Sequence, residues 1–225
     1  MQRRKFLKSS ATLMSTLPLI NVNKFDLFNT ASFVEIARTM IGKFNCTIFR
    51  DLMFKYLAKD FFINANPEEL TKALEKYQVK PDNIPSPFTP MLVQQEDKKI
   101  LIDTGVGFSE KPVNVRGNAV TFQGRLKQLL QEEQIKKEDI TDVIITHFHP
   151  DHVGGIFNEE AQLNFPNAKF HMHEQEWNYW HSSQSDNQPD QFKYFIKKNI
   201  TPLKDLNLNL IKGDFTDLLP GVTTV

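Results

Sequence analysis

The stretch Thr146–Gly155 reads T-H-F-H-P-D-H-V-G-G and decides most of what this sequence predicts. Within six consecutive positions it places three imidazoles and one carboxylate, namely His147, His149, Asp151 and His152. The apolar run 142–146 before it is typical of a strand, and alternate side chains of a strand share one face. We therefore expect His147 and His149 to point the same way.

Pro150 interrupts this run, because proline cannot donate to a sheet and favours a turn. Asp151 and His152 are therefore expected to aim at a second point, at the spacing of a two-metal site. Nitrogen and oxygen donors without a thiolate suit zinc, manganese or iron. The stretch predicts a site for two divalent metal ions, with zinc as the first candidate. The alternative is a histidine-rich surface loop, but three of the six histidines of the chain fall here.

The chain resembles the metallo-β-lactamase-fold superfamily, whose motif His-x-His-x-Asp-His follows a core strand and matches here at all four positions. The run Leu101–Gly105 is similar to the family's strand that ends in Asp-Thr-Gly. Three further segments resemble the branch of N-acyl-homoserine lactonases and methyl-parathion-hydrolase-like enzymes: 84–89, 165–168 and 219–222.

The resemblance implies an α/β fold, layered in the α+β manner as a four-layer αββα sandwich with the metals at one edge. It assigns residues 31–225 to this domain. In the family a further metal-binding histidine follows soon after the Pro-Gly-Val strand, and the sequence stops at Val225, where that segment is expected to begin. We therefore expect the second half of the sandwich to be incomplete.

The resemblance also implies a metal-dependent hydrolase, in which a metal-bound hydroxide attacks a lactone or another ester, or a phosphotriester. Asp151 is the expected catalytic residue, as a ligand that also orients the hydroxide. Asp103 is expected to hold a ligand in place from behind, or simply to form a turn beside Gly105. Two alternatives stay open: a mononuclear iron enzyme of the persulfide dioxygenase kind, and a catalytically inert fragment or binding module.

The N-terminus carries Arg3 and Arg4 ahead of a short, weakly apolar run. We interpret residues 1–30 as an export signal of the twin-arginine kind, which predicts a periplasmic or secreted protein. The apolar run is too short to span a bilayer, so no stable membrane anchor is expected after export. Cys46 is the single cysteine and is expected to be a small buried residue.

Composition narrows the class of partner. The chain of 225 residues has 27 basic and 27 acidic residues, so its net charge is zero and no nucleic-acid partner is expected. The expected partner is a small-molecule substrate, and a homodimer stays open. A second His-x-His, at His171 and His173, has no carboxylate following at ligand spacing, and we interpret it as packed or surface imidazoles.

Hydrophobic periodicity and turn residues predict the remaining elements. Strands are expected at 43–49, 60–63, 91–95, 99–103, 142–146, 168–172, 206–211 and 222–225. Helices are expected from Asn66 onward and at 124–134, 174–180 and 191–198. The four prolines in 81–90 predict a loop, and 108–122 is expected to be irregular. Core packing is the default for the many phenylalanines, but some could line a substrate pocket, namely Phe88, Phe108 and Phe122.

Overall fold

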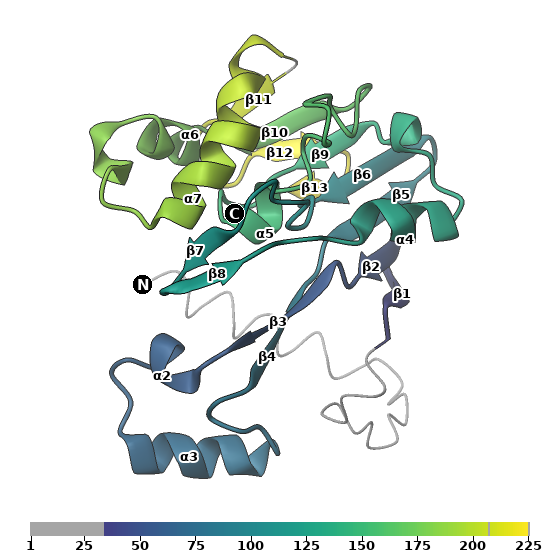
Figure 1. Cartoon of the computed structure of the whole chain (residues 1–225). Coiled ribbons are helices and arrows are strands. Elements are labelled where there is room, and N and C mark those ends of the chain that lie inside the picture. Colours follow the sequence, from purple (N-terminus) through teal and green to yellow (C-terminus); the bar gives the residue numbers. More distant parts are fainter. Residues whose placement is uncertain (1–33, 207, 225) are drawn as a thin grey trace. The chain divides into compact units, whose positions relative to one another are not determined.

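Seven strands form the central sheet of this computed structural model, in the order β1-β2-β5-β6-β9-β10-β11 (Figure 1). The structure describes residues 34–206 and 208–224. The first four strands are antiparallel to their neighbours: β1 (Ile36–Ile41), β2 (Phe44–Phe49), β5 (Met91–Gln95) and β6 (Lys98–Ile102). From β6 onward the neighbours are parallel: β9 (Asp142–Ile144), β10 (Lys169–His173) and β11 (Leu208–Ile211). The predicted α/β class is therefore confirmed.

Helices supply the crossovers that parallel strands require. They are α4 (Leu126–Glu132) between β6 and β9, and α6 (Glu174–Trp180) and α7 (Asp190–Phe195) between β10 and β11. Alternation along the strands divides the apolar residues between the two faces. Leu92, Leu101 and Val143 join the helices in the larger buried cluster. Their neighbours Val93 and Ile100 join a smaller one on the other face.

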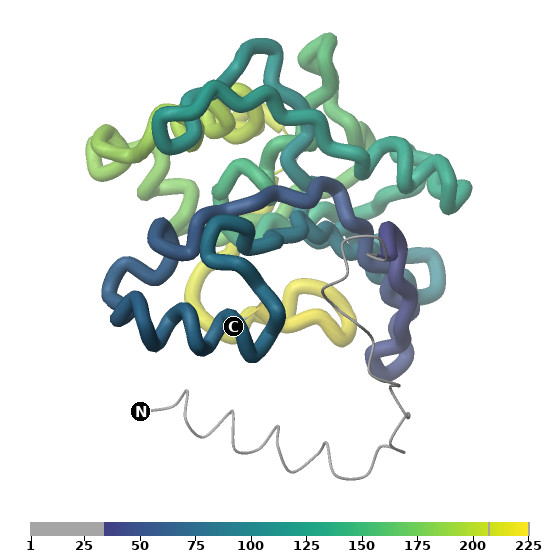
Figure 2. Tube along the Cα trace, turned by 60° about the horizontal axis from the view of Figure 1, so that its bottom comes forward, coloured from purple at the N-terminus to yellow at the C-terminus, as the bar shows by residue number. Residues whose placement is uncertain are grey.

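The smaller cluster is covered by the C-terminal segment. Its hairpin comprises β12 (Asp217–Leu219) and β13 (Val222–Thr223), and Leu219 and Val222 pack against the cluster. Figure 2 shows this segment, in yellow, on the side of the sheet away from α7. Cys46 belongs to the smaller cluster and is only 2% exposed, as expected for a small buried residue.

An arm between β2 and β5 corrects two predictions. It consists of β3 (Leu52–Tyr56), α2 (Ala58–Phe61), α3 (Pro67–Lys76) and β4 (Ile84–Phe88). The strand predicted at 60–63 is wrong, because α2 and a turn occupy it. The loop predicted at 81–90 is also wrong: β4 pairs with β3 alone, and such a two-stranded edge tolerates proline.

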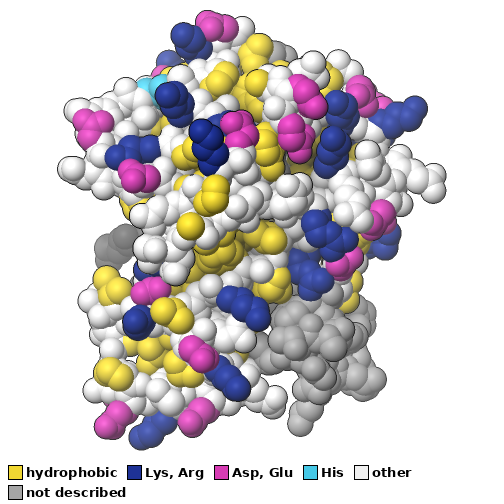
Figure 3. Space-filling model, viewed as in Figure 1, with side chains coloured by type: hydrophobic (Ala, Val, Ile, Leu, Met, Phe, Trp, Pro, Cys, Tyr) yellow, Lys and Arg dark blue, Asp and Glu magenta, His cyan; other side chains and the backbone are white. Residues whose placement is uncertain are grey.

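The start of α3 is as predicted. Asn66 caps the helix by accepting hydrogen bonds from the backbone N–H groups of Glu68 and Glu69. The helix buries none of its residues, and several apolar side chains of the arm are exposed. The space-filling view shows hydrophobic side chains gathered over the arm (Figure 3). The exposed ones include Leu57, Phe61, Phe62, Ile63 and Tyr77.

Further short elements complete the chain. The segment predicted to be irregular contains the hairpin of β7 (Val113–Val115) and β8 (Asn118–Val120), whose turn residues Arg116 and Gly117 both have positive φ. Such two-residue turns match the twist of paired strands. The other short helical segments are α5 (Pro150–Val153), η2 (Lys137–Asp139), η3 (Ser183–Ser185), η4 (Ile196–Ile200) and η5 (Thr201–Asp205).

Residues 34–225 form one compact unit. The predicted export signal at 1–30 lies outside the described residues. Among the residues that are described, none of the helices has the length and apolar character needed to cross a bilayer. The carboxyl ends of β6, β9 and β10 lie at one edge of the sheet, since the three strands run parallel, and the histidine-rich stretch follows β9 at that edge.

Candidate metal centre

The histidine-rich stretch joins β9 to the single turn of α5. His149 precedes the helix, and Pro150 occupies its first position, where proline is favoured. The ring of His147 lies 4.5 Å from that of His149 and 3.9 Å from that of His152, measured between centroids. The prediction that Asp151 and His152 aim at a second point, a few ångströms from the first, stays a prediction. The turn of α5 returns His152 to His147, so the imidazoles form one cluster.

Asp103 is the main partner of His152. Its Oδ2 lies 2.7 Å from Nδ1 of His152, so the imidazole donates from Nδ1 and leaves Nε2 directed away from this carboxylate. The same carboxylate accepts hydrogen bonds from the backbone N–H and the hydroxyl of Thr146. The predicted position of Asp103 behind a ligand candidate is therefore what the geometry shows.

The backbone at Asp103 has φ of +59°, in the left-handed region that non-glycine residues rarely adopt. This conformation turns a carboxylate at the end of β6 toward the loop after β9. Such strain persists only where surrounding contacts fix the conformation, and here the contacts are to Thr146 and His152. The side chain of Asp103 is almost wholly buried, with 8% of the residue exposed.

The two loops that carry Asp103 and His152 lie in direct backbone contact. The N–H and the hydroxyl of Thr104 both donate to the carbonyl oxygen of His152, at 2.8 and 2.9 Å. A Cβ on Gly154 would lie 2.0 Å from the carbonyl oxygen of Val106, and one on Gly155 would lie 2.1 Å from that of Thr104. Only glycine therefore allows this approach.

Burial and neighbouring charges set the protonation of the cluster. Burial lowers the pKa of His147, and the charges of His152 and His149 lower it further. Burial also lowers the pKa of His149 and outweighs the charge of Asp151, which acts in the opposite direction. Burial also disfavours the charged form of His152, but hydrogen bonds to Asp103 and Asp151 outweigh it and raise the pKa of His152 to about 9. For Asp151, burial is outweighed in the same way by the hydrogen bond to His152, so its pKa is lowered.

The imidazole nitrogens and the carboxylate oxygens of this cluster are chemically suited to bind a divalent cation. Neutral imidazoles and a carboxylate are the usual ligands of zinc, and a carboxylate behind a histidine fixes the ring for metal binding. In the conformation described, Nε2 of His152 lies 3.2 Å from Oδ2 of Asp151. Within the described ranges no three His, Cys, Asp or Glu side chains are yet placed to share an ion. The 3.2 Å between Nε2 of His152 and Oδ2 of Asp151 is close to the separation of two donors on one tetrahedral zinc with bonds of roughly 2.0–2.1 Å, so a cation could take both atoms once it displaces the proton on Nε2 of His152.

A cavity of about 750 Å³ opens beside the cluster, and His149 and Asp151 contribute to its wall. Six aromatic side chains form one part of the wall: Phe54, Tyr56, Phe61, Phe88, Phe122 and Phe192. Polar side chains form another part, namely Ser86, Asn114, Arg116, Asp190 and Gln191. Burial and the charge of Asp151 raise the pKa of Tyr56 to about 12, so its phenol keeps its proton at neutral pH. Phe88 and Phe122 are thus both core and wall residues, whereas Phe108 faces a different cavity.

Two supporting residues were missed by sequence reasoning. Glu176 on α6 accepts a hydrogen bond from the backbone N–H of Phe148, between the first two histidines, and another from Trp180 Nε1. Asp51 is wholly buried and accepts from the N–H groups of Val106, Arg125 and Leu126. Neither carries a local signal, because both act on segments far away in the sequence.

The second His-x-His is structural, as expected. His171 is 2% exposed, and both of its ring nitrogens are engaged, Nε2 by Asp142 at 2.9 Å and Nδ1 by Asn209 at 3.0 Å. His173 caps α6 by accepting from the N–H of Gln175. Neither is directed at the cluster around His147.

Comparison with known proteins agrees with this architecture. The metallo-beta-lactamase superfamily profile matches residues 89–224. The chain is similar to AidC, a dizinc quorum-quenching lactonase solved with the product N-hexnoyl-L-homoserine, at 24% identity and a TM-score of 0.61 over 79% of this chain and 61% of that one. It is similar to the hydrolase AbOPH of the beta lactamase superfamily, at 22% identity and a TM-score of 0.67 over 83% and 64%.

A probable metal-dependent hydrolase from Staphylococcus aureus is also similar, at 20% identity and a TM-score of 0.65 over 82% of this chain and 64% of that one. These likenesses show the fold, and the chain spans less than two thirds of each of the three neighbours. Curated protein sequences give no significant match. The profile covers more than half of the chain, which therefore belongs to the metallo-beta-lactamase superfamily.

Proposed function

We propose that this protein is a metal-dependent hydrolase of a small ester-type substrate, with lactones as the first candidate class and phosphotriesters as the second. One observation carries the proposal. A compact group of imidazoles, with His152 fixed from behind by Asp103, lies at the wall of a cavity large enough for a small molecule. A histidine cluster beside a cavity, together with a carboxylate whose pKa is shifted, here that of Asp151, is typical of an active site.

His147, His149, Asp151 and His152 would hold the cation or cations, with zinc first and manganese or iron as alternatives. When bound, a divalent cation lowers the pKa of water and polarises a carbonyl or phosphoryl oxygen. Two such ions need more ligands than these four side chains provide, since a catalytic zinc takes three protein ligands. The described residues are thus proposed to hold part of the full ligand set.

Asp151 is proposed as the residue that orients the attacking water. Its lowered pKa keeps it a carboxylate at neutral pH, and its carboxylate helps to line the cavity, where a water and a substrate would meet. A carboxylate in this place accepts a hydrogen bond from water and fixes the direction of attack. His152 holds it in place at 3.2 Å.

Tyr56 is proposed to bind the substrate. Its phenol remains protonated and lines the cavity among the aromatic side chains, so it offers a donor on the aromatic part of the wall. A polar donor among apolar side chains orients a ligand that has an apolar body and a carbonyl or phosphoryl oxygen. Lactone hydrolysis is favoured because AidC, which shares the fold, is described as a lactonase.

The test is hydrolysis by the zinc-loaded protein of a lactone, a phosphotriester and a β-lactam, with metal content measured in parallel. We expect lactone cleavage that a chelator abolishes and zinc restores. His149→Ala and Asp151→Ala should each remove this turnover while the fold, followed by circular dichroism, is kept. Unchanged rates in either variant contradict the proposal. So does a preparation that holds one iron and consumes oxygen without cleaving esters.

A further inference from the structure

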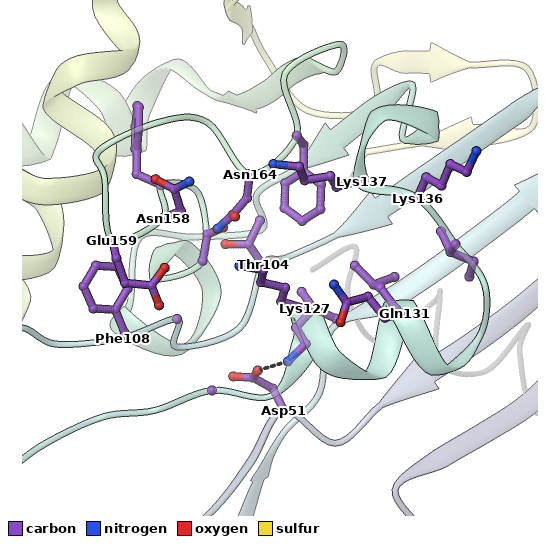
Figure 4. A pocket seen from close by; sticks show the side chains of 18 of the residues that line it. Asp51, Thr104, Phe108, Lys127, Gln131, Lys136, Lys137, Asn158, Glu159 and Asn164 are labelled. Atoms are coloured by element: carbon purple, nitrogen blue, oxygen red, sulfur yellow. Dashed lines mark hydrogen bonds between the residues drawn. The ribbon is translucent and has the colours of Figure 1, made fainter.

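A second cavity, of about 460 Å³, lies on the other side of the loop that follows Asp103. Val106 faces the cavity beside the histidines, whereas Thr104, Gly107 and Phe108 face the second one. Figure 4 shows Asn158 and Glu159 on one side of this second cavity, and Lys127 and Gln131 of α4 on the other. It shares no lining residue with the aromatic cavity and contains none of the candidate metal ligands.

The inner wall of the second cavity is apolar. Three lining side chains come from α4 and the segment after it, and three from the loops that face them: Leu126, Leu130, Ile135, Phe108, Phe157 and Phe165. Most of them belong to the larger buried cluster, so the wall is held by the core rather than by a mobile surface. A volume of this size on an apolar wall is typical of a small-molecule site.

Asn158 supplies a hydrogen-bond donor to this cavity. The residue is only 8% exposed, and its Oδ1 already accepts from the N–H groups of Glu160 and Gln162. Its Nδ2 donates to no group among the described residues, and Asn158 lines the cavity. Because Nδ2 is accessible and has no partner among the described residues, it can donate to a ligand that brings an acceptor oxygen into the cavity.

Charge at the mouth favours an anion. Lys127 and Lys136 line the cavity and form no ion pair with a described residue, whereas Lys137 has Glu138 within 3.9 Å. Glu159 is exposed and is the opposing charge, on the same side of the cavity as Asn158 and across from Lys127 (Figure 4). Asp51 also lines the cavity, but its carboxylate is taken up by backbone N–H groups. The two unpaired ammonium groups therefore outnumber the exposed unpaired carboxylate.

We propose that this second cavity is a binding site for an amphipathic monocarboxylate with an aliphatic chain. The chain lies against the apolar inner wall, and the carboxylate accepts from Nδ2 of Asn158 in the field of Lys127 and Lys136. Charge-assisted hydrogen bonds to a carboxylate are stronger than neutral ones, so the head group fixes the orientation. This site is separate from the proposed hydrolytic one, and its test needs no metal.

The test is calorimetric titration of the chelator-treated protein with octanoate, with octylamine and octanol as probes of the head group. We expect saturable binding of octanoate, weaker binding of octanol and none of octylamine. Asn158→Asp keeps the acceptor that holds the loop but replaces the donor by a like charge, and should weaken octanoate binding by about tenfold or more. Lys127→Glu, at an exposed position, should weaken it in the same direction.

Phe61→Ala in the aromatic cavity is the matched control and should leave octanoate binding unchanged. The proposal is overturned if Asn158→Asp and Lys127→Glu both bind octanoate as the unmodified protein does. It is also overturned if Phe61→Ala abolishes binding, which would place the ligand beside the histidines, or if octylamine binds at least as well as octanoate. Absence of any octanoate binding to the folded protein overturns it outright.

Discussion

The chain contains two groups of histidines, the stretch Thr146–Gly155 and the pair His171 and His173, each with one histidine bonded to a buried aspartate, and the molecule uses them in opposite ways. In the first, Nδ1 of His152 donates to Asp103, while Nε2 faces Asp151 beside the cavity. In the second, both nitrogens of His171 are engaged inside the sheet by Asp142 and Asn209. A histidine binds a metal through a ring nitrogen that carries no proton. The second partner therefore separates the two residues: Nε2 of His152 faces Asp151, which is itself a candidate ligand at the cavity wall, whereas Nδ1 of His171 is held by the amide of Asn209 inside the fold.

Their surroundings shift the two imidazoles in opposite directions. Burial lowers the pKa of His171 despite the carboxylate of Asp142, whereas two carboxylates outweigh burial at His152 and raise its pKa to about 9. The side chain of His171 is 3% exposed and that of His152 is 25% exposed. A more open position and a second carboxylate therefore make the difference.

The largest expected effect comes from removing a candidate metal ligand that faces another candidate ligand. His152→Ala should abolish tight zinc binding, because it removes one candidate ligand and leaves Asp151 and Asp103 without their partner. Calorimetry with zinc measures this directly. Zinc binding by His152→Ala with unmodified affinity would show that the cluster is not the metal site.

The aspartates bonded to His152 and His171, namely Asp103 and Asp142, allow a second comparison of the two groups. Asp103→Asn should lower zinc affinity by about 10- to 100-fold, the usual effect of losing a carboxylate that orients a ligand histidine. Asp142→Asn should leave zinc affinity unchanged and instead cost about 1–3 kcal/mol in the free energy of unfolding, because the buried His171 loses a charged partner. The two quantities are measured by calorimetry and by urea denaturation. Equal losses of zinc affinity in both variants would remove the distinction.

The pH dependence of stability provides a third way to test the difference. Since the folded state holds His171 neutral, the unfolded chain binds more protons below about pH 6.5, and stability falls as the pH falls through that range. His171→Gln keeps a donor for Asp142 but does not titrate, so its stability should fall less steeply. Urea denaturation of both proteins between neutral and acidic pH measures the two slopes. Parallel slopes would contradict a neutral buried His171.

The smallest effect is expected at His173, the second histidine of the structural motif. Its side chain caps α6, and His173→Ala should cost about 0.5 kcal/mol in the free energy of unfolding. Zinc affinity should not change, since the ring lies outside the cluster around His147. A clear loss of zinc binding in this variant would make the second motif part of the metal site.

The sequence was sufficient to predict that the three histidines lie together and, with the family resemblance, that Asp103 lies beside them, whereas their role as metal ligands stays a prediction. Alternation on a strand, a proline and two glycines predict the cluster, and Asp103 ends the neighbouring strand. It was insufficient for Asp51 and Glu176, which hold distant backbone N–H groups. The arm was mispredicted for a related reason: β4 tolerates its prolines only because it pairs with β3 alone.

The most direct test of the metal centre is a crystal grown with zinc and measured at the zinc absorption edge. The account predicts anomalous density bonded to imidazole nitrogen of His147, His149 or His152, at roughly 2.0–2.1 Å. It also predicts that Nδ1 of His152 keeps its hydrogen bond to Asp103 when zinc replaces the proton on Nε2. Ordered zinc at His171 or His173, or none at the cluster in a crystal that holds zinc elsewhere, would contradict it.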